Sequence, residues 1–271
     1  MTTVYAFLKN KGGVGCTTTA FNFATWLAYH GKSVLLMDGD QQGDCTALCG
    51  MKHQSGMYNL LANNQEFDDV WRPVPAARYG LQPGEERLWI VPNDERSGKD
   101  VAASMSDETV MATRLLEVEG RFDVVIIDTS PSASEFHVGL YYAAHWLVYP
   151  TQAQTEPVNA LKRSMQYYRS TPSAISTSNG DIFDKGQVLG IIPCMFRGRD
   201  KLQHTLMGVL QAKSEEDNWN TRVLPQLSDA TVWQQAASQR TPIFLFDRRS
   251  KAAREANKLF EAMTEHVYAK A

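Results

Sequence analysis

The chain has 271 residues, 43% of them hydrophobic and 21% charged, a composition that excludes a disordered chain and predicts a globular protein. Its formal net charge of −3 excludes a global positive field, so any contact with nucleic acid must come from a local patch. No apolar run approaches the roughly 18–20 residues of a membrane span, and the first residues lack the pattern of a signal peptide. The four cysteines form no CxxC pair, which favours a reduced, cytoplasmic setting.

Strand and helix patterns alternate along the chain, without an internal repeat. Short apolar runs predict strands at 3–8, 33–38, 87–92, 122–128, 146–150, 187–196 and 221–227. Helical spacing of apolar residues predicts helices at 18–31, 107–120, 155–170, 200–214 and 250–268. Two stretches poor in periodicity and rich in turn-forming residues, 63–86 and 172–186, are predicted as surface loops.

Strands that are apolar throughout and alternate with helices indicate a mostly parallel sheet that helices cover on both faces. We therefore predict a single doubly wound α/β domain over residues 1–271. In such folds ligands bind at the carboxyl ends of the strands. The chemistry-bearing motifs of this chain follow predicted strands, so we expect them to meet at that edge.

A glycine-rich segment, "KGGVGCTT" (11–18), follows the first predicted strand and opens the first helix. Its three glycines allow a tight turn that presents backbone N–H groups to an anion, and the helix N-terminus adds partial positive charge. Thr17 stands where a phosphate-binding loop places its Mg²⁺-ligating hydroxyl, whereas Cys16 stands where that loop places its lysine. A plain strand-to-helix turn is the alternative, and the hydroxyls after Cys16 argue against it.

Segments along nearly the whole chain resemble the ParA/MinD family of P-loop ATPases. "KGGVGCTT" resembles the family's deviant Walker A box, KGGxGK[ST], and "VLLMDGDQQGDCT" (34–46) its first switch. "FDVVIIDTSPS" (122–132) is similar to the Walker B and second-switch segment. "PTQAQTEPVNALKR" (150–163) and "PIFLFDRRSKAA" (242–253) resemble later ParA segments. The resemblance implies a P-loop NTPase fold closest to small ParA partitioning ATPases, and we expect no N-terminal helix-turn-helix domain.

The resemblance also implies ATP and Mg²⁺ as ligands and assigns roles to single residues. Lys11 matches the signature lysine that reaches across an ATP-dependent homodimer to the partner's phosphates. Asp40 would orient the attacking water, and the Mg²⁺ shell would include Thr17, Asp40 and Asp128, the carboxylates directly or through water. The nucleotide cradle would comprise Lys11, Gly12, Gly13, Val14, Gly15, Cys16, Thr17 and Thr18.

One further position follows from the same resemblance, and another from the cost of burying a carboxylate. The adenine base would lie near residues 193–196 and the turn at 224–230. Asp38 and Asp128 both end apolar strands beside the glycine loop, where a carboxylate without a cation or donor would be costly. We therefore also expect Asp38 to lie near the Mg²⁺ site.

Cys16 is the main departure from the family pattern. A lysine there would make charge-assisted hydrogen bonds to phosphate, and losing one such bond weakens affinity by about 10- to 100-fold. We expect weakened ATP binding and more strongly impaired hydrolysis, because charge builds up in the transition state. Cys16 is either natural or an engineered substitution, and as a thiol at a helix N-terminus it is also a candidate redox-sensitive gate. Cys45 and Cys49 are interpreted as buried thiols, because no histidine pair accompanies them as metal ligands.

Two basic stretches are candidate DNA contacts, with solvated surface as the alternative: Arg197, Arg199 and Lys201 in the first, and Arg248, Arg249 and Lys251 in the second. ParA relatives bind DNA non-specifically in the ATP state, so the resemblance implies phosphate contacts and nucleoid association. The last predicted helix places Leu259, Phe260 and Met263 on one face and acidic residues on the other. That pattern favours packing on the sheet over membrane anchoring.

The leading hypothesis for function is a ParA-type ATP-dependent switch for plasmid or chromosome segregation, with a ParB-like or other activating partner. The alternative is a nucleotide-binding positioning scaffold or regulator of the same family with little hydrolysis, which Cys16 favours. A metabolic or redox enzyme on the same fold is disfavoured. A nitrogenase-type iron protein needs a cluster cysteine after the second switch, and "DTSPSASEF" (128–136) contains none.

Overall fold

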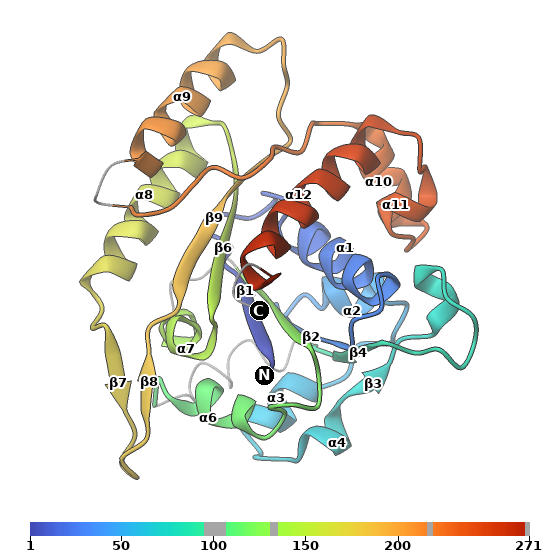
Figure 1. The fold of residues 1–271 in the computed structure, drawn as a ribbon, viewed down its shortest axis with the longest axis vertical. Coiled ribbons are helices and arrows are strands. Elements are labelled where there is room, and N and C mark those ends of the chain that lie inside the picture. Colours follow the sequence, from blue (N-terminus) through green and yellow to red (C-terminus); the bar gives the residue numbers. More distant parts are fainter. Residues whose placement is uncertain (95–106, 131–134, 216–218, 269–271) are drawn as a thin grey trace.

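The computed structural model describes residues 1–94, 107–130, 135–215 and 219–268. A seven-stranded sheet with the order β3-β4-β2-β5-β1-β6-β9 forms its centre (Figure 1). The strands are β1 (Thr3–Phe7), β2 (Val34–Gly39), β3 (Arg72–Pro73), β4 (Leu88–Val91), β5 (Val124–Thr129), β6 (Trp146–Gln152) and β9 (Gln187–Cys194). They pair in parallel, apart from the antiparallel pair of β3 with β4. The predicted single α/β domain with a mostly parallel sheet is therefore confirmed.

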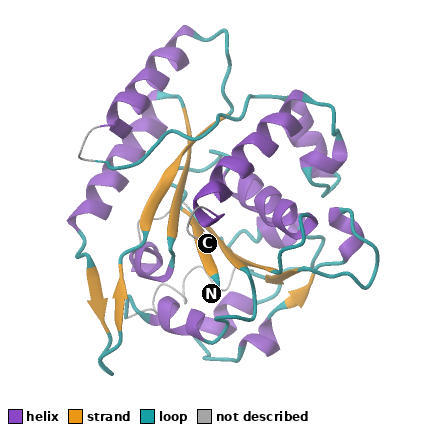
Figure 2. Ribbon diagram, in the orientation of Figure 1, coloured by secondary structure: helices purple, strands orange, loops and turns teal. Residues whose placement is uncertain are grey.

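Helices cover both faces of this sheet (Figure 2). One face carries α1 (Cys16–Tyr29), α2 (Asp44–Leu48), the 3₁₀ helix η1 (Ala76–Tyr79), α10 (Thr231–Ser238), α11 (Ile243–Phe246) and α12 (Lys251–Tyr268). The other face carries α3 (Gly56–Leu61), α4 (Phe67–Val70), α6 (Val110–Leu116), α7 (Glu135–Ala143), α8 (Thr155–Ser170) and α9 (Lys201–Glu215). Successive residues of each central strand point into opposite cores, which explains why the strands are apolar throughout.

The Phe23 ring joins three elements on the first face. It packs against Tyr5 and Phe7 of β1 and against Phe260 of α12, with ring centroids 5.3, 6.1 and 5.4 Å away. Leu259, Phe260 and Met263 are fully buried, so the apolar face of α12 packs on the sheet side of the molecule, as predicted. Within the described part of the chain, none of the helices has the length and apolar character that a membrane crossing requires.

Three predicted segments differ from the structure. Residues 63–86 are not a plain surface loop: they contain α4, β3 and η1, and bury Phe67 and Tyr79, because prolines interrupt the periodicity without removing the apolar contacts. Residues 172–186 form a separate antiparallel hairpin of β7 (Ala174–Ser176) and β8 (Ile182–Asp184). The fully described segment 221–227 makes one isolated bridge to β9, between Val223 and Ile191, instead of a strand, since Pro225 has no N–H to donate.

Candidate functional site

The glycine loop lies at the carboxyl edge of the sheet, between β1 and α1. Gly13 and Gly15 have φ values of 75° and 86°, a left-handed conformation that favours glycine. A Cβ on Gly12 or Gly13 would meet nothing within 4 Å, so this side of the loop is open. Val14 is buried and holds the loop in the core, while Thr18 is half-buried. The loop is therefore an open backbone cradle in front of the N-terminus of α1, which suits an anion.

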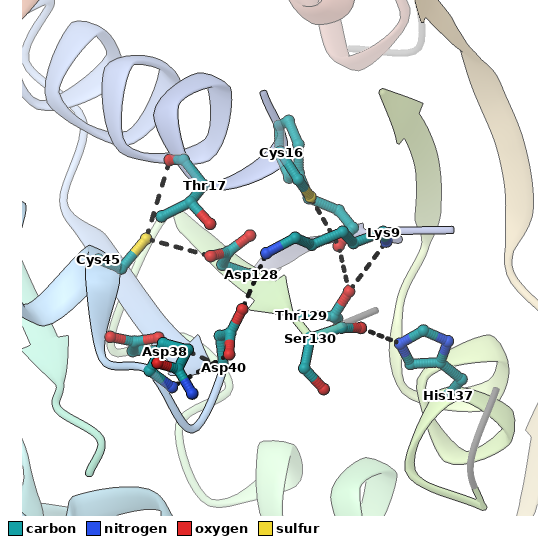
Figure 3. A network of polar contacts seen from close by, with 12 residues as sticks. Lys9, Cys16, Thr17, Asp38, Asp40, Cys45, Asp128, Thr129, Ser130 and His137 are labelled. Carbon is teal, nitrogen blue, oxygen red and sulfur yellow. Dashed lines mark hydrogen bonds and ion pairs between the residues drawn. The ribbon is translucent and has the colours of Figure 1, made fainter. Parts of the chain in front are cut away.

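Cys16 is the first residue of α1, and its side chain turns away from the open side of the loop. It is 1% exposed, and its Sγ donates to the Phe7 carbonyl oxygen at 3.4 Å (Figure 3). Burial, followed by the nearby Asp128 carboxylate, raises the pKa of the Cys16 thiol well above its ordinary value. The hypothesis of a redox-sensitive gate is therefore wrong, because a reactive cysteine needs a lowered pKa and access.

Three buried aspartates meet where β2 and β5 end. Asp38 and Asp128 are direct partners in the register of these two parallel strands, and Asp40 follows just after β2. The Asp38 carboxylate accepts hydrogen bonds from the Thr46 backbone N–H at 2.7 Å and from its hydroxyl at 2.6 Å. Asp38 therefore positions α2 through one carboxylate oxygen, and its other oxygen accepts from the Asp40 backbone N–H at 3.3 Å.

Two buried oxygens at the mouth of the loop lack a hydrogen-bond partner among the described residues: Thr17 Oγ1 and Asp128 Oδ1. The other carboxylate oxygen of Asp128 accepts from Cys45 Sγ at 3.6 Å. Buried polar atoms are normally paired, and Mg²⁺ in nucleotide sites takes one or two protein oxygens together with phosphates and waters. The described residues contain no cluster of three or more histidine, cysteine or acidic side chains that could hold a metal by themselves. The residues present fit a Mg²⁺ ion that a nucleotide helps to hold.

The buried acids predict a pH dependence for the nucleotide-free protein. Burial, followed by the charge of Asp128, raises the pKa of Asp38 to about 7, and burial raises the pKa of Asp128 to about 6. Both values exceed that of an unfolded aspartate, so the native state binds more protons than the unfolded state between about pH 4 and 7. The contribution of Asp128 to the free energy of unfolding should therefore fall by an amount on the order of 3 kcal/mol as pH rises through this window, whereas the lowered pKa of His137, about 4, acts in the opposite direction.

Urea unfolding at pH 5 and pH 8 measures how the free energy of unfolding changes with pH. From pH 5 to pH 8 the free energy of unfolding should change less unfavourably in Asp128→Asn than in the unaltered chain, because the variant lacks the raised carboxyl pKa and keeps His137. Asp68→Asn is the control, because Asp68 is exposed and its Arg121 hydrogen bond lowers its pKa. An unchanged pH dependence in Asp128→Asn would contradict the assignment.

Two lysines at the start of the loop have acidic partners that the sequence did not indicate. Lys9 Nζ lies 2.9 Å from Asp40 Oδ2, with the lysine side chain 12% exposed (Figure 3). Lys11 pairs with Glu156 at the N-terminus of α8, and both side chains are far more exposed. The only sequence signal for Lys9 was a second lysine before the glycines. Glu156 had none, because it lies 145 positions from Lys11.

The second-switch segment is described only in part. Ser130 O accepts a hydrogen bond from His137 Nε2 at 3.0 Å, and burial lowers the pKa of His137 to about 4. This neutral histidine of α7 was not among the predicted site residues. Pro131 and Ser132, which belong to the segment that resembles the second switch, lie outside the described residues.

A cavity of about 170 Å³ opens beside the loop. Its walls include Gly15 and Thr18 on the loop side, Met195 after β9, and Leu227 and Trp233 across from them. Both segments predicted to approach adenine contribute to these walls. The cavity therefore offers an apolar slot next to the phosphate cradle, which is the arrangement that a purine nucleotide needs.

The two basic stretches adjoin the same turn. Arg197 Nε pairs with Asp229 Oδ2 at 2.6 Å, and Lys251 Nζ lies 3.4 Å from Glu255 Oε1. The other carboxylate oxygen of Glu255 accepts from the backbone N–H and the hydroxyl of Ser228, directly before Asp229. The other four basic side chains of these stretches are exposed: Arg199, Lys201, Arg248 and Arg249. Because Ser228 and Asp229 also line the cavity, both stretches lie next to it.

Comparison with known proteins assigns the family. A model of the AAA domain family matches residues 2–177. The chromosome-partitioning ATPase Soj of Thermus thermophilus is 30% identical over 243 residues, 88% of each chain, and Soj of Treponema pallidum is 27% identical over 256 residues, 93% of each chain. The chain belongs to the ParA/MinD family of P-loop ATPases. The ParA/MinD fold is also seen in a solved ATP complex of McdA from Cyanothece, with a TM-score of 0.79 and 21% identity over 98% of this chain and 96% of that one.

Proposed function

We propose that this chain is a ParA-type switch that binds Mg²⁺-ATP, dimerises when loaded, binds DNA non-specifically as a dimer and hydrolyses ATP slowly. Relatives named for chromosome partitioning, carboxysome distribution and cell division support an intracellular positioning role. The cargo that we propose is a plasmid or chromosome, which this switch would help to segregate. A ParB-like or other partner protein would stimulate the release of the dimer from DNA.

The observation that carries this proposal is the pair of unpartnered oxygens, Thr17 Oγ1 and Asp128 Oδ1, beside the open glycine loop. Phosphoryl transfer needs positioning and charge neutralisation more than a strong base. The loop N–H groups and the α1 N-terminus would hold the phosphates, Thr17 and Asp128 would face the metal, and Asp40 would orient water. The bound metal ion would neutralise the charge that develops on the phosphates.

Calorimetric titration of the chain with ATP, with and without Mg²⁺, tests nucleotide binding. We expect binding that requires Mg²⁺ and a change in the fluorescence of Trp233, which lines the cavity. The fluorescence change should disappear in Trp233→Phe, while binding persists.

Light scattering should then show a dimer with Mg²⁺-ATP and a monomer with Mg²⁺-ADP. Absence of nucleotide binding, or binding without dimerisation, would overturn the switch.

DNA binding should depend on the two basic stretches and on salt. Replacing Arg248 and Arg249 with glutamine should weaken the affinity of the ATP-loaded protein for random duplex DNA and reduce its salt dependence, because each lost phosphate contact reduces counterion release. The matched control is the removal of two charges at the opposite, amino edge of the sheet, Lys32 and Arg169. Equal losses in both double variants would argue against a local DNA-binding surface.

The alternative, a nucleotide-binding scaffold with little hydrolysis, rests on Cys16. Its neutral, buried thiol supplies no charge to a developing transition state. Phosphate release by the dimer on DNA distinguishes the two functions. Turnover that DNA or a partner protein stimulates supports the segregation switch, whereas a stable ATP-bound dimer without turnover supports the scaffold.

A further inference from the structure

The position of Cys16 leaves the phosphate loop without the cation that its own helix would normally supply. The thiol is buried against the Phe7 carbonyl oxygen and stays neutral at pH 7. Lys11 is paired with Glu156 on the surface and is predicted to serve the partner's nucleotide. A triphosphate entering this loop would also approach three buried aspartates, Asp38, Asp40 and Asp128. A cation within the same chain would reduce that repulsion.

Lys9 places an ammonium group at this corner of the site. Its Nζ lies 2.9 Å from Asp40 Oδ2, and the Asp128 carboxylate and Cys16 are among its electrostatic neighbours (Figure 3). Burial by itself would lower the pKa of Lys9, but the hydrogen bond and charge of Asp40 and the charge of Asp128 raise it above its ordinary value. Lys9 therefore remains charged although its side chain is only 12% exposed.

Hydrogen bonds link both Lys9 and Cys16 to the carbonyl oxygen of Phe7. The Lys9 N–H donates to Thr129 Oγ1 at 3.1 Å, and that hydroxyl donates to the Phe7 carbonyl oxygen at 2.8 Å. The same carbonyl oxygen accepts from Cys16 Sγ. Lys9 thus follows closely after the last residue of β1, Phe7, and the Cys16 side chain packs against the carbonyl group of that same residue. The Lys9 ammonium is also close enough to Cys16 and Asp128 to interact with both electrostatically.

We propose that Lys9 is the phosphate-binding cation of this site and replaces, within the same chain, the charge that Cys16 lacks. This inference rests on the proposed nucleotide-binding function. Before nucleotide binds, Lys9 neutralises Asp40. When nucleotide is present, the same ammonium lies between Asp40 and the phosphates, and it donates to a phosphate oxygen. A purely structural ion pair between Lys9 and Asp40 is the competing explanation.

Calorimetry with Mg²⁺-ADP, Mg²⁺-ATP and adenosine on four proteins tests the proposal: the unaltered chain, Lys9→Met, Cys16→Lys and the double variant. Lys9→Met should weaken Mg²⁺-ADP and Mg²⁺-ATP binding by about 10- to 100-fold, the effect of one charge-assisted hydrogen bond. Adenosine affinity should not change, because Lys9 would contact only phosphate. Cys16→Lys should restore most of the loss in the Lys9→Met background and add less in the unaltered chain, because the two lysines would share one role.

Two controls separate charge from folding. Lys185→Met removes a half-buried lysine whose Nζ donates to the carbonyl oxygens of Tyr168 and Thr171, outside the site, and should leave all three affinities unchanged. Lys9→Gln removes the charge but keeps a donor for Asp40, and it should reproduce the loss in Lys9→Met. Thermal unfolding of each ligand-free variant checks that it folds.

The outcomes are distinct. If the unaltered chain binds no Mg²⁺-nucleotide, both the proposed function and this inference fail. If it binds nucleotide and neither Lys9→Met nor Lys9→Gln weakens binding, the role of Lys9 alone is overturned. A parallel loss of adenosine affinity would also overturn it, because that result would mean a structural role for the ion pair.

Discussion

Lys11→Met is expected to abolish ATP-driven dimerisation and to lower turnover by about 10²- to 10³-fold, the loss typical of removing one group that stabilises transition-state charge. The side chain of Lys11 is 44% exposed on the open loop, and its partner Glu156 is 79% exposed. An exposed ion pair is worth little, so Lys11 can leave Glu156 without a large cost. Light scattering with Mg²⁺-ATP and phosphate release measure the two effects.

The nucleotide affinity of the monomer shows whether Lys11 acts on the nucleotide of its own chain or on that of the partner. If Lys11 acts on the partner's phosphates, Lys11→Met should leave monomer affinity for Mg²⁺-ADP within a few-fold of the original, unlike Lys9→Met. Glu156→Gln is the matched control, since it releases Lys11 and should leave the dimer at least as stable. A Lys11→Met protein that still dimerises normally would contradict a role across the interface.

Phe23→Ala is expected to destabilise the fold by about 3–5 kcal/mol, because it leaves a cavity in a packed core. The ring is fully buried and contacts Tyr5, Phe7 and Phe260, so its loss loosens the junction of β1, α1 and α12. For a chain of this size, Tm should fall by roughly 10 °C.

Denaturant unfolding at constant pH measures the free energy of unfolding for Phe23→Ala. The control is Leu202→Ala on α9, whose side chain is 57% exposed and whose removal should change stability by less than about 0.5 kcal/mol. Similar losses in the two variants would show that Phe23 does not join the three elements as strongly as its contacts indicate.

Several features of the fold were predictable from local patterns. The continuous apolar runs of β1, β2, β4, β5, β6 and β9 reflect strands buried on both faces, so these runs and their alternation with helical patterns were enough to predict the strands and the parallel sheet. The helices α1, α8, α9 and α12 were long enough for their periodicity to be visible. The short helices α4 and α11 have four residues each, fewer than the two turns that a helical period needs, and they depend on tertiary packing.

The sequence was enough to recognise the glycine loop, because a phosphate-binding turn needs particular residues at fixed local spacing. It also showed that a cysteine stands at the usual lysine position and that acids end β2 and β5. The sequence by itself therefore determined the fold class and the family, and the fold placed these residues on one edge of the sheet. Only the tertiary structure decided which polar and charged groups meet. The pairing of Lys9 with Asp40, of Lys11 with Glu156 and of Asp38 with Thr46 depends on strand order and helix placement. Electrostatic interactions act through space over a few ångströms, and partners that lie 31 or 145 residues apart leave no periodic trace in the chain.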